Sequence, residues 1–465
     1  MRALLASSIS VACATALALP LAASADAAAR PTTTAVSSPA ASTSAASVST
    51  SAASASASAA STLAVSTSAA SPTRPSSASA SSSSAAEPAG STQSLPLAPL
   101  GTTDRTLGAA RAQGLPERGT GPFSLLGVVW DDARDELHGT VQVRTRAAGS
   151  RTWSGWQDLD THNQEHAPDP GSPEDDAARV HGSTAPLWVG HSDGVQVRVR
   201  PEASGAGRTT PGRLPRGLHV DLIDPGEDPD GVGAADEAGQ EDGPGRERAL
   251  APAAGAPEAA ARPYIGPRPR IVTRRGWGAD ESLRERGYVY TGKVKAAFVH
   301  HTASGNNYRC SQAPSVLRSI YRYHVLSSGW RDIGYNFAVD KCGNIYEGRA
   351  GGVAKPVLGA HTLGFNTNSM GVAVIGTYTS TNPTADALDA IARLTAWKLG
   401  LYGVNPTGTT HLTSGGGNLY RKGRSVRLNA ISGHRDGFAT ECPGARLYKK
   451  LGKARTSSAR LQGRR

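Results

Sequence analysis

The sequence predicts an α/β domain with a mixed central β-sheet flanked by helices, preceded by a small all-β domain and by disordered linkers. Two kinds of pattern support this fold class. Residues 96–225 contain runs such as GVQVRVR, in which apolar and polar residues alternate as in half-buried antiparallel strands. Residues 263–455 combine continuous apolar runs with segments of helical spacing, which is typical of a sheet covered by helices.

Length and charge limit the interpretation further. The chain has 465 residues, which exceeds what one hydrophobic core organises and indicates two or three domains. Its formal net charge of +11 indicates an anionic partner. Charge alone does not choose among nucleic acid, a membrane surface and a bacterial wall polymer.

The first part of the chain has the features of an exported protein. Residues 1–25 carry a basic residue, a short apolar stretch and small residues at Ala23 and Ala25, which predicts a cleavable signal peptide. A membrane anchor is the less favoured alternative, because the apolar stretch is short and contains Pro20 near its end. Residues 26–95 are almost wholly Ala, Ser and Thr, which predicts a disordered linker. We therefore expect a secreted protein, extracellular or associated with a cell wall.

The all-β domain offers no candidate catalytic set. Trp153, Trp156 and Trp188 within residues 96–225 could stack on sugar rings, but tryptophan in a small β domain more often belongs to the core. Residues 226–262 are acidic at first and then rich in Ala and Pro, which predicts an interdomain linker.

The α/β domain is predicted over residues 263–455, element by element. An apolar run closed by two histidines predicts a strand, and a second continuous apolar run predicts a central strand buried on both faces. A Pro near the start and a Gly at the end frame an amphipathic helix. Residues 456–465 are expected to form a basic tail. The predicted elements are a strand over 294–301, a helix from 314, a hairpin over 334–349, a strand over 369–376 and a helix over 383–400.

Histidine and cysteine residues at the two ends of this domain predict a zinc site. Zn²⁺ binds imidazole nitrogen and thiolate sulfur, and catalytic sites use three protein ligands and leave one position open. One histidine of the pair His300 and His301, together with His434 and Cys442, would make such a site.

The remaining cysteines suggest a disulfide. Cys13 lies in the predicted leader, so a mature chain keeps three cysteines. If Cys442 binds metal, Cys310 and Cys342 are left as a pair, which fits an oxidising compartment.

Several motifs in one order resemble a known family. HHTA, GW followed by DIGYNF, YEGR, GAHTLGFN, and GHRD followed by CPG are similar to motifs of the peptidoglycan recognition protein and type-2 amidase family. The segment TRRGWGAD resembles the usual start of that family's domain, so the resemblance covers roughly residues 268–450. Together these motifs are highly specific, although each is weak alone.

The resemblance implies a zinc-dependent N-acetylmuramoyl-L-alanine amidase. Such enzymes hydrolyse the amide bond between N-acetylmuramic acid and the L-Ala of peptidoglycan stem peptides. The motif positions give His300, His434 and Cys442 as the Zn²⁺ ligands. Neighbouring residues of a strand point to opposite faces, so His300 and His301 cannot both reach one metal. The family pattern favours His300, which leaves His301 as a supporting or structural residue. The implied partners are peptidoglycan and muropeptides, with no nucleic acid and no stable membrane insertion.

The resemblance also implies two residues with catalytic roles. Tyr335 matches the family's catalytic tyrosine, which positions water or donates a hydrogen bond to the developing oxyanion. The alternative for Tyr335 is an ordinary core tyrosine on a strand. Thr440 supplies a hydroxyl between His434 and Cys442, where it can hydrogen-bond an intermediate but brings no positive charge.

A substrate cleft is implied by four further positions. His361, Thr362 and Asn366 match residues that line the muropeptide cleft of the family. Arg349 matches an arginine that pairs with the extra carboxylate of diaminopimelate stems, a task suited to a guanidinium fork. Ala and Gly follow Arg349, where such members commonly have Gly and Trp. The preference for diaminopimelate or lysine stems therefore stays open.

Two other functions compete with the amidase. A peptidoglycan-binding protein without activity would share the fold, and such members typically lack the cysteine ligand that Cys442 provides here. A zinc peptidase is disfavoured because no HExxH motif occurs. The basic tail is expected either to lie on anionic wall polymers or to be solvated.

Overall fold

The computed structural model describes residues 90–100, 112–176, 178–202, 213–228 and 264–465. The predicted signal peptide lies outside these residues, as do almost all of the first predicted linker and most of the second. None of the helices in the described residues is long and apolar enough to cross a membrane.

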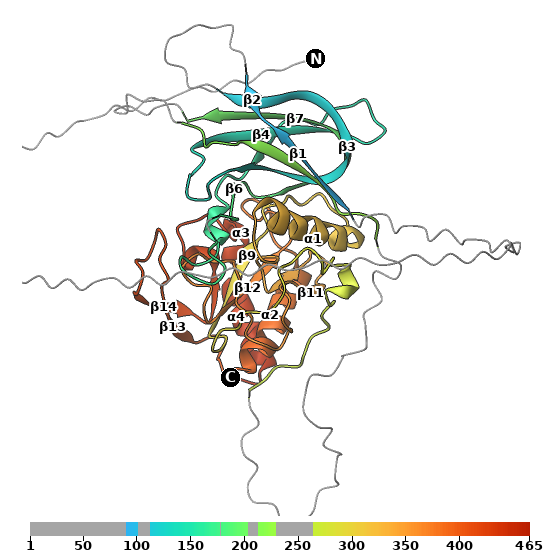
Figure 1. Ribbon diagram of the computed structural model, residues 1–465. Helices are drawn as coiled ribbons and strands as arrows, with labels where there is room; N and C mark the ends of the chain where they lie inside the picture. The colour runs from blue at the N-terminus through green and yellow to red at the C-terminus, as the bar shows by residue number, and fades with distance from the viewer. Residues whose placement is uncertain (1–89, 101–111, 177, 203–212, 229–263) are drawn as a thin grey trace, which may run out of the picture. The chain divides into compact units, whose positions relative to one another are not determined.

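The all-β part is one antiparallel sheet with the order β1-β8-β3-β7-β4-β5, and β2 and β6 pair with β3 (Figure 1). Its apolar core includes Phe123, Val128 and Val197, each at most 1% exposed. Val197 belongs to the alternating run GVQVRVR, whereas residues 123–130 are buried at every position. The strands are β1 (Ser91–Pro96), β2 (Ala98–Pro99), β3 (Gln113–Trp130), β4 (Gly139–Ala147), β5 (Gln157–Leu159), β6 (Gly182–Ser183), β7 (Leu187–Pro201) and β8 (His219–Asp224).

Two features of this sheet differ from simple expectation. Strand β1 begins at Ser91, inside the stretch predicted as linker, because its backbone pairs with β8 despite its polar side chains. Only Trp188 of the three tryptophans is buried. Trp153 and Trp156 are half-buried beneath arginines, with the guanidinium of Arg198 3.9 Å from the centroid of the Trp156 ring.

The α/β part contains a mixed five-stranded sheet in the order β11-β10-β12-β9-β15. Strands β10, β12, β9 and β15 are parallel, and β11 is antiparallel to β10. These strands are β9 (Ala296–His301), β10 (Phe337–Val339), β11 (Ile345–Glu347), β12 (Ser369–Val374) and β15 (Ile431–Gly433), and β13 (Thr409–Thr413) and β14 (Ser425–Asn429) form a separate pair.

Helices cover both faces of this sheet, as the sequence predicted. On one face α1 packs Val316 and Ile320 against Ala338 and Ala373, while on the other α2 packs against residues such as Val372. Thr384 caps α2, because its side chain accepts a hydrogen bond from the backbone nitrogen of Ala387. The helices are α1 (Ala313–Arg322), α2 (Ala385–Gly400), α3 (Ala445–Tyr448) and α4 (Leu451–Leu461).

The end of the chain is helical where a basic tail was expected. Helix α4 runs to Leu461 and buries Leu451, Ala454 and Ser458. Thr395 of α2 lies 3.1 Å from Ser458, oxygen to oxygen, so the two helices are in direct contact. Leu451, Ala454 and Ser458 are spaced by three and four positions, which places these small and apolar side chains on one face of the helix. The prediction of a tail was based on the many basic residues and did not use this spacing.

Side-chain and backbone contacts join the all-β sheet to the α/β part. The hydroxyl of Tyr323 donates to the carbonyl of Thr184 at 3.0 Å, and the backbone nitrogen of Trp188 donates to Ser304 at 3.0 Å. Cys310, just before α1, and Cys342, in the turn after β10, form a disulfide with a Cα–Cα distance of 6.2 Å.

Candidate metal centre and substrate cleft

Neighbouring parallel strands bring two predicted metal ligands together. His300 lies near the carboxyl end of β9, and His434 follows β15, whose residue Gly433 pairs with Val299. Their imidazole centroids are 4.6 Å apart. Cys442 reaches the same place, with its Sγ 3.7 Å from Nδ1 of His300. All three side chains are buried.

His301 lies outside this group. Its Nδ1 accepts a hydrogen bond from the backbone nitrogen of Tyr378 at 3.2 Å. His300 and His301 are successive strand residues, so their side chains leave opposite faces of the sheet. The structure therefore places the first histidine of the pair, and not the second, beside His434 and Cys442.

The hydrogen bonds of the two imidazoles leave one nitrogen of each for a metal. Nε2 of His300 lies 3.3 Å from Nδ1 of His361, and Nε2 of His434 lies 3.2 Å from the carbonyl oxygen of Glu165. Among the described residues, Nδ1 of His434 has no hydrogen-bond partner. Partners of this kind fix the orientation of metal-binding imidazoles. The Nδ1 atoms of His300 and His434 thus remain available beside the Cys442 sulfur.

Burial sets the protonation of these groups. It lowers the pKa of His300 and of His434 well below the usual value, so both rings are neutral, which is the form that binds metal. Burial also raises the pKa of the Cys442 thiol well above its usual value. A bound cation reverses that effect by favouring the thiolate. The donor set therefore fits a metal ion such as zinc.

A fourth donor comes from the all-β part of the chain. His166 lies at the end of a short 3₁₀-helix, Gln164–His166, and its Nε2 is 3.9 Å from Sγ of Cys442. One donor atom from each of His166, His300, His434 and Cys442 falls within 4.8 Å of the others. The sequence prediction did not include His166, although the run HNQEH that it closes has the H-x-x-E-H spacing of one class of zinc enzymes.

The two predicted catalytic residues lie beside this cluster. Tyr335 is buried, and its ring centroid is 5.5 Å from that of His300. The hydroxyl of Thr440 accepts a hydrogen bond from the backbone nitrogen of Cys442 at 3.0 Å and donates to the carboxylate of Glu165. Burial raises the pKa of Glu165 to about 8.

The predicted cleft residues are covered instead of exposed. His361, Thr362 and Asn366 are each at most 1% exposed. The side chain of Asn366 accepts from the backbone nitrogens of His361 and Thr362 and donates to Asp169 at 2.7 Å. Asp169 belongs to the same stretch as His166, so this stretch covers the predicted cleft.

Arg349 is also buried, at 5% exposed. Its guanidinium donates to the carbonyl oxygens of Ile333 and Leu358 at 2.9 and 3.1 Å and forms an ion pair with Glu174. Arg349 therefore both supports the local backbone and presents its charge to a carboxylate.

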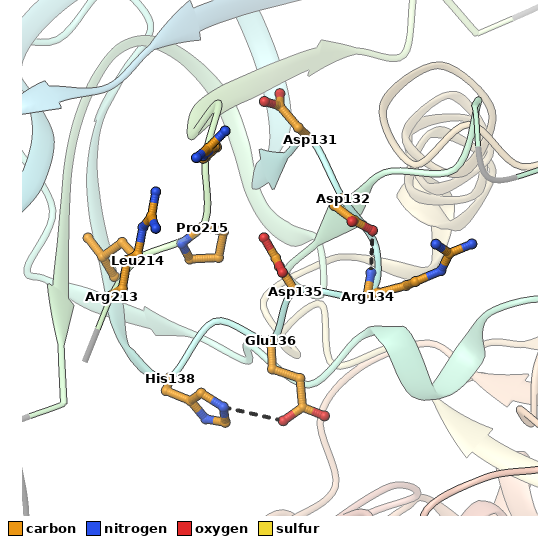
Figure 2. A pocket seen from close by; sticks show the side chains of 10 residues that line it. Asp131, Asp132, Arg134, Asp135, Glu136, His138, Arg213, Leu214 and Pro215 are labelled. Carbon is orange, nitrogen blue, oxygen red and sulfur yellow. Dashed lines mark hydrogen bonds and ion pairs between the residues drawn. The ribbon is translucent and has the colours of Figure 1, made fainter. Parts of the chain in front are cut away.

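Figure 2 shows a separate hollow on the all-β part, in which acidic and basic side chains face one another. Within it, Nε2 of His138 lies 3.5 Å from a carboxylate oxygen of Glu136. None of the residues that line it belongs to the cluster of histidines and cysteine.

Comparison with known proteins shows which family and which relatives this chain resembles. The profile of N-acetylmuramoyl-L-alanine amidase matches residues 290–445, and a profile described as Rv3811 N-terminal galactose-binding domain-like matches residues 75–216. Peptidoglycan-recognition protein SC2 of Drosophila simulans is 31% identical over 183 residues, which are 39% of this chain and 84% of the relative. N-acetylmuramoyl-L-alanine amidase of Homo sapiens is 34% identical over 188 residues, which are 39% of this chain and 28% of the relative. The solved structure of wild-type Drosophila PGRP-LB is 28% identical, covers 39% of this chain and 92% of its own, and has a TM-score of 0.32.

The fold and the site define a protein that has an all-β domain followed by an α/β domain. A group of histidines and one cysteine in it is suited to bind a metal ion. The chain belongs to the peptidoglycan recognition protein and N-acetylmuramoyl-L-alanine amidase family.

Proposed function

We propose that the chain is a secreted, zinc-dependent N-acetylmuramoyl-L-alanine amidase that hydrolyses the amide bond between N-acetylmuramic acid and L-Ala in peptidoglycan stem peptides. The observation that carries this proposal is the position of Cys442, whose sulfur lies beside Nδ1 of His300. His300, His434 and Cys442 would hold the metal. When bound, zinc supplies an acidified water and polarises the scissile carbonyl.

The surrounding residues contribute orientation and hydrogen bonding. His361 holds the ring of His300 through its Nε2 atom, and in this conformation the carbonyl of Glu165 holds the ring of His434 in the same way. Burial raises the pKa of Tyr335 well above its usual value, so its phenol stays protonated. A protonated phenol beside the cluster is suited to donate a hydrogen bond to the oxyanion that develops on the substrate carbonyl.

The test is release of stem peptide from purified peptidoglycan sacculi. Removal of metal with a chelator should abolish release, and added zinc should restore it. Cys442→Ser should abolish release while the protein still sediments with sacculi. The matched control is His411→Ala, which changes an exposed histidine on β13 outside the cluster and should leave release unchanged. Full activity of Cys442→Ser would overturn the ligand assignment.

Binding of peptidoglycan without hydrolysis is the second candidate. It is supported by the 31% identity to peptidoglycan-recognition protein SC2 of Drosophila simulans, a protein named for recognition of peptidoglycan. The two candidates differ in one measurement: mass spectrometry of a defined muropeptide after incubation shows a cleaved amide bond only for an amidase.

A further inference from the structure

We propose that His166 is a fourth protein ligand of the metal, and that residues 160–176, here called the inserted segment, keep the site closed until they are displaced. The inference rests on the proposed zinc amidase function. The inserted segment leads from β5, which ends at Leu159, toward β6, which begins at Gly182.

His166 lies within the cluster of metal-binding side chains. Its side chain is 6% exposed, and its ring centroid lies 4.7 Å from that of His434 and 5.4 Å from that of His300. Zinc sites with four protein ligands are closed, whereas catalytic sites keep one position for water or substrate. A histidine in this place therefore occupies the position that hydrolysis needs.

Glu165 fixes its neighbour His166 in place. The carbonyl oxygen of Glu165 contacts Nε2 of His434 at 3.2 Å and accepts from the backbone nitrogen of Leu363 at 2.9 Å. Its carboxylate accepts from the hydroxyl of Thr440. These contacts hold the residue before His166 to both sides of the cluster.

Asp169 of the inserted segment is also buried, at 8% exposed. It accepts from the backbone nitrogen of Gly364 and from the side chain of Asn366, each at 2.7 Å. Ala167 adds its carbonyl oxygen, which lies 3.1 Å from the same amide of Asn366. The inserted segment thus uses a polar group that the family resemblance places in the muropeptide cleft.

Glu174 of the inserted segment forms an ion pair with Arg349, and both side chains are buried, at 5% and 4% exposed. A buried charge is stable only with a partner, so each holds the other. The carboxylate of Glu174 therefore occupies the position where a diaminopimelate carboxylate would pair with Arg349, and that of Asp169 contacts the cleft side chain Asn366. Substrate cannot use either group while these contacts remain.

The test uses the full chain loaded with Co²⁺, whose visible absorption reports the coordination of the metal. The probe is azide, which binds only at an open position. We expect the wild-type spectrum to be unchanged by azide and the His166→Ala spectrum to shift. We also expect His166→Ala to hydrolyse a defined muropeptide at least about tenfold faster, because activity scales with the open fraction.

Two further variants make the result decisive. His162→Ala changes an exposed histidine of the same segment and should behave like the wild type in both assays. If His166→Ala fails to fold, the double variant Asp169→Asn with Glu174→Gln keeps all four donors but weakens the contacts of the inserted segment. It should gain partial sensitivity to azide.

The outcomes separate this inference from the proposed function. A wild-type cobalt spectrum that responds to azide as His166→Ala does would overturn the fourth ligand. Loss of hydrolysis in His166→Ala without a spectral change would also overturn it, since His166 would then assist the reaction. The expected spectra without hydrolysis by any variant would support the fourth ligand and refute the amidase.

Discussion

The carboxylate of Glu174, in the all-β part of the chain, is paired with the guanidinium of Arg349 at the end of the α/β hairpin, and both groups are buried. Arg349 also donates to the carbonyl oxygens of Ile333, Leu358 and Asp332. The residue proposed to choose the stem peptide thus already faces a carboxylate of its own chain.

The first prediction concerns this arginine. Arg349→Ala should erode a preference for diaminopimelate stems over lysine stems, because a charge-assisted hydrogen bond contributes roughly 1–3 kcal/mol, which corresponds to a preference of about five- to 150-fold. The measurement is the ratio of kcat/KM for two muropeptides that differ only in the third stem residue. The ratio cancels any general loss caused by the missing backbone contacts. An equal loss on both substrates would mean that Arg349 is only structural.

Some site residues could be predicted from the sequence because strand pairing within one sheet sets their positions. Others could not, because contacts between distant parts of the chain set theirs. Strand alternation separates His300 from His301, and the parallel pairing of β9 and β15 brings His434 to the same edge. His166 lies 268 positions before His434 and reaches it only because the all-β part docks on the α/β part. Such docking has no periodicity in the sequence, so neither the approach of His166 to the cluster nor the burial of Asn366 could be predicted.

The second prediction concerns Tyr335. Tyr335→Phe should lower kcat by about 10²–10³, the usual cost of removing one donor to an oxyanion. Zinc content should stay unchanged, because the phenol is not one of the four candidate donors. Tyr402→Phe is the control, since its hydroxyl donates to the carbonyl of Ala354 at 2.8 Å, away from the cluster. Loss of zinc from Tyr335→Phe would instead indicate that the phenol supports the metal site.

The third prediction concerns the disulfide of Cys310 and Cys342, which are separated by 32 positions in sequence. The double variant Cys310→Ala with Cys342→Ala should lose roughly 3–4 kcal/mol of unfolding free energy, because a closed loop of this size restricts the unfolded chain. Urea denaturation of both proteins measures the difference. Zinc content should not change. An unfolding midpoint equal to that of the wild type would show that the loop is held by other contacts.

The last prediction is a dependence of stability on pH that originates at Lys398. This side chain is 2% exposed, its ammonium donates to the carbonyl oxygen of Lys355 at 2.7 Å, and burial lowers its pKa from 10.5 to about 7. At pH values between about 7 and 10.5, Lys398 is protonated in the unfolded chain and deprotonated in the folded chain. The unfolding free energy contributed by Lys398 therefore rises with pH across this window and is constant below it.

The measurement is urea denaturation of the wild type and of Lys398→Met at several pH values from neutral upward. Lys398→Met retains an unbranched apolar chain but cannot titrate, so the difference between the two proteins isolates this group. As pH rises, the unfolding free energy of the wild type should increase relative to that of the variant by at most about 1.4 kcal/mol per pH unit, the limit for one proton. Parallel curves over the whole range would show that Lys398 keeps its proton in the folded protein and that the two carbonyl oxygens of Val353 and Lys355 offset its burial.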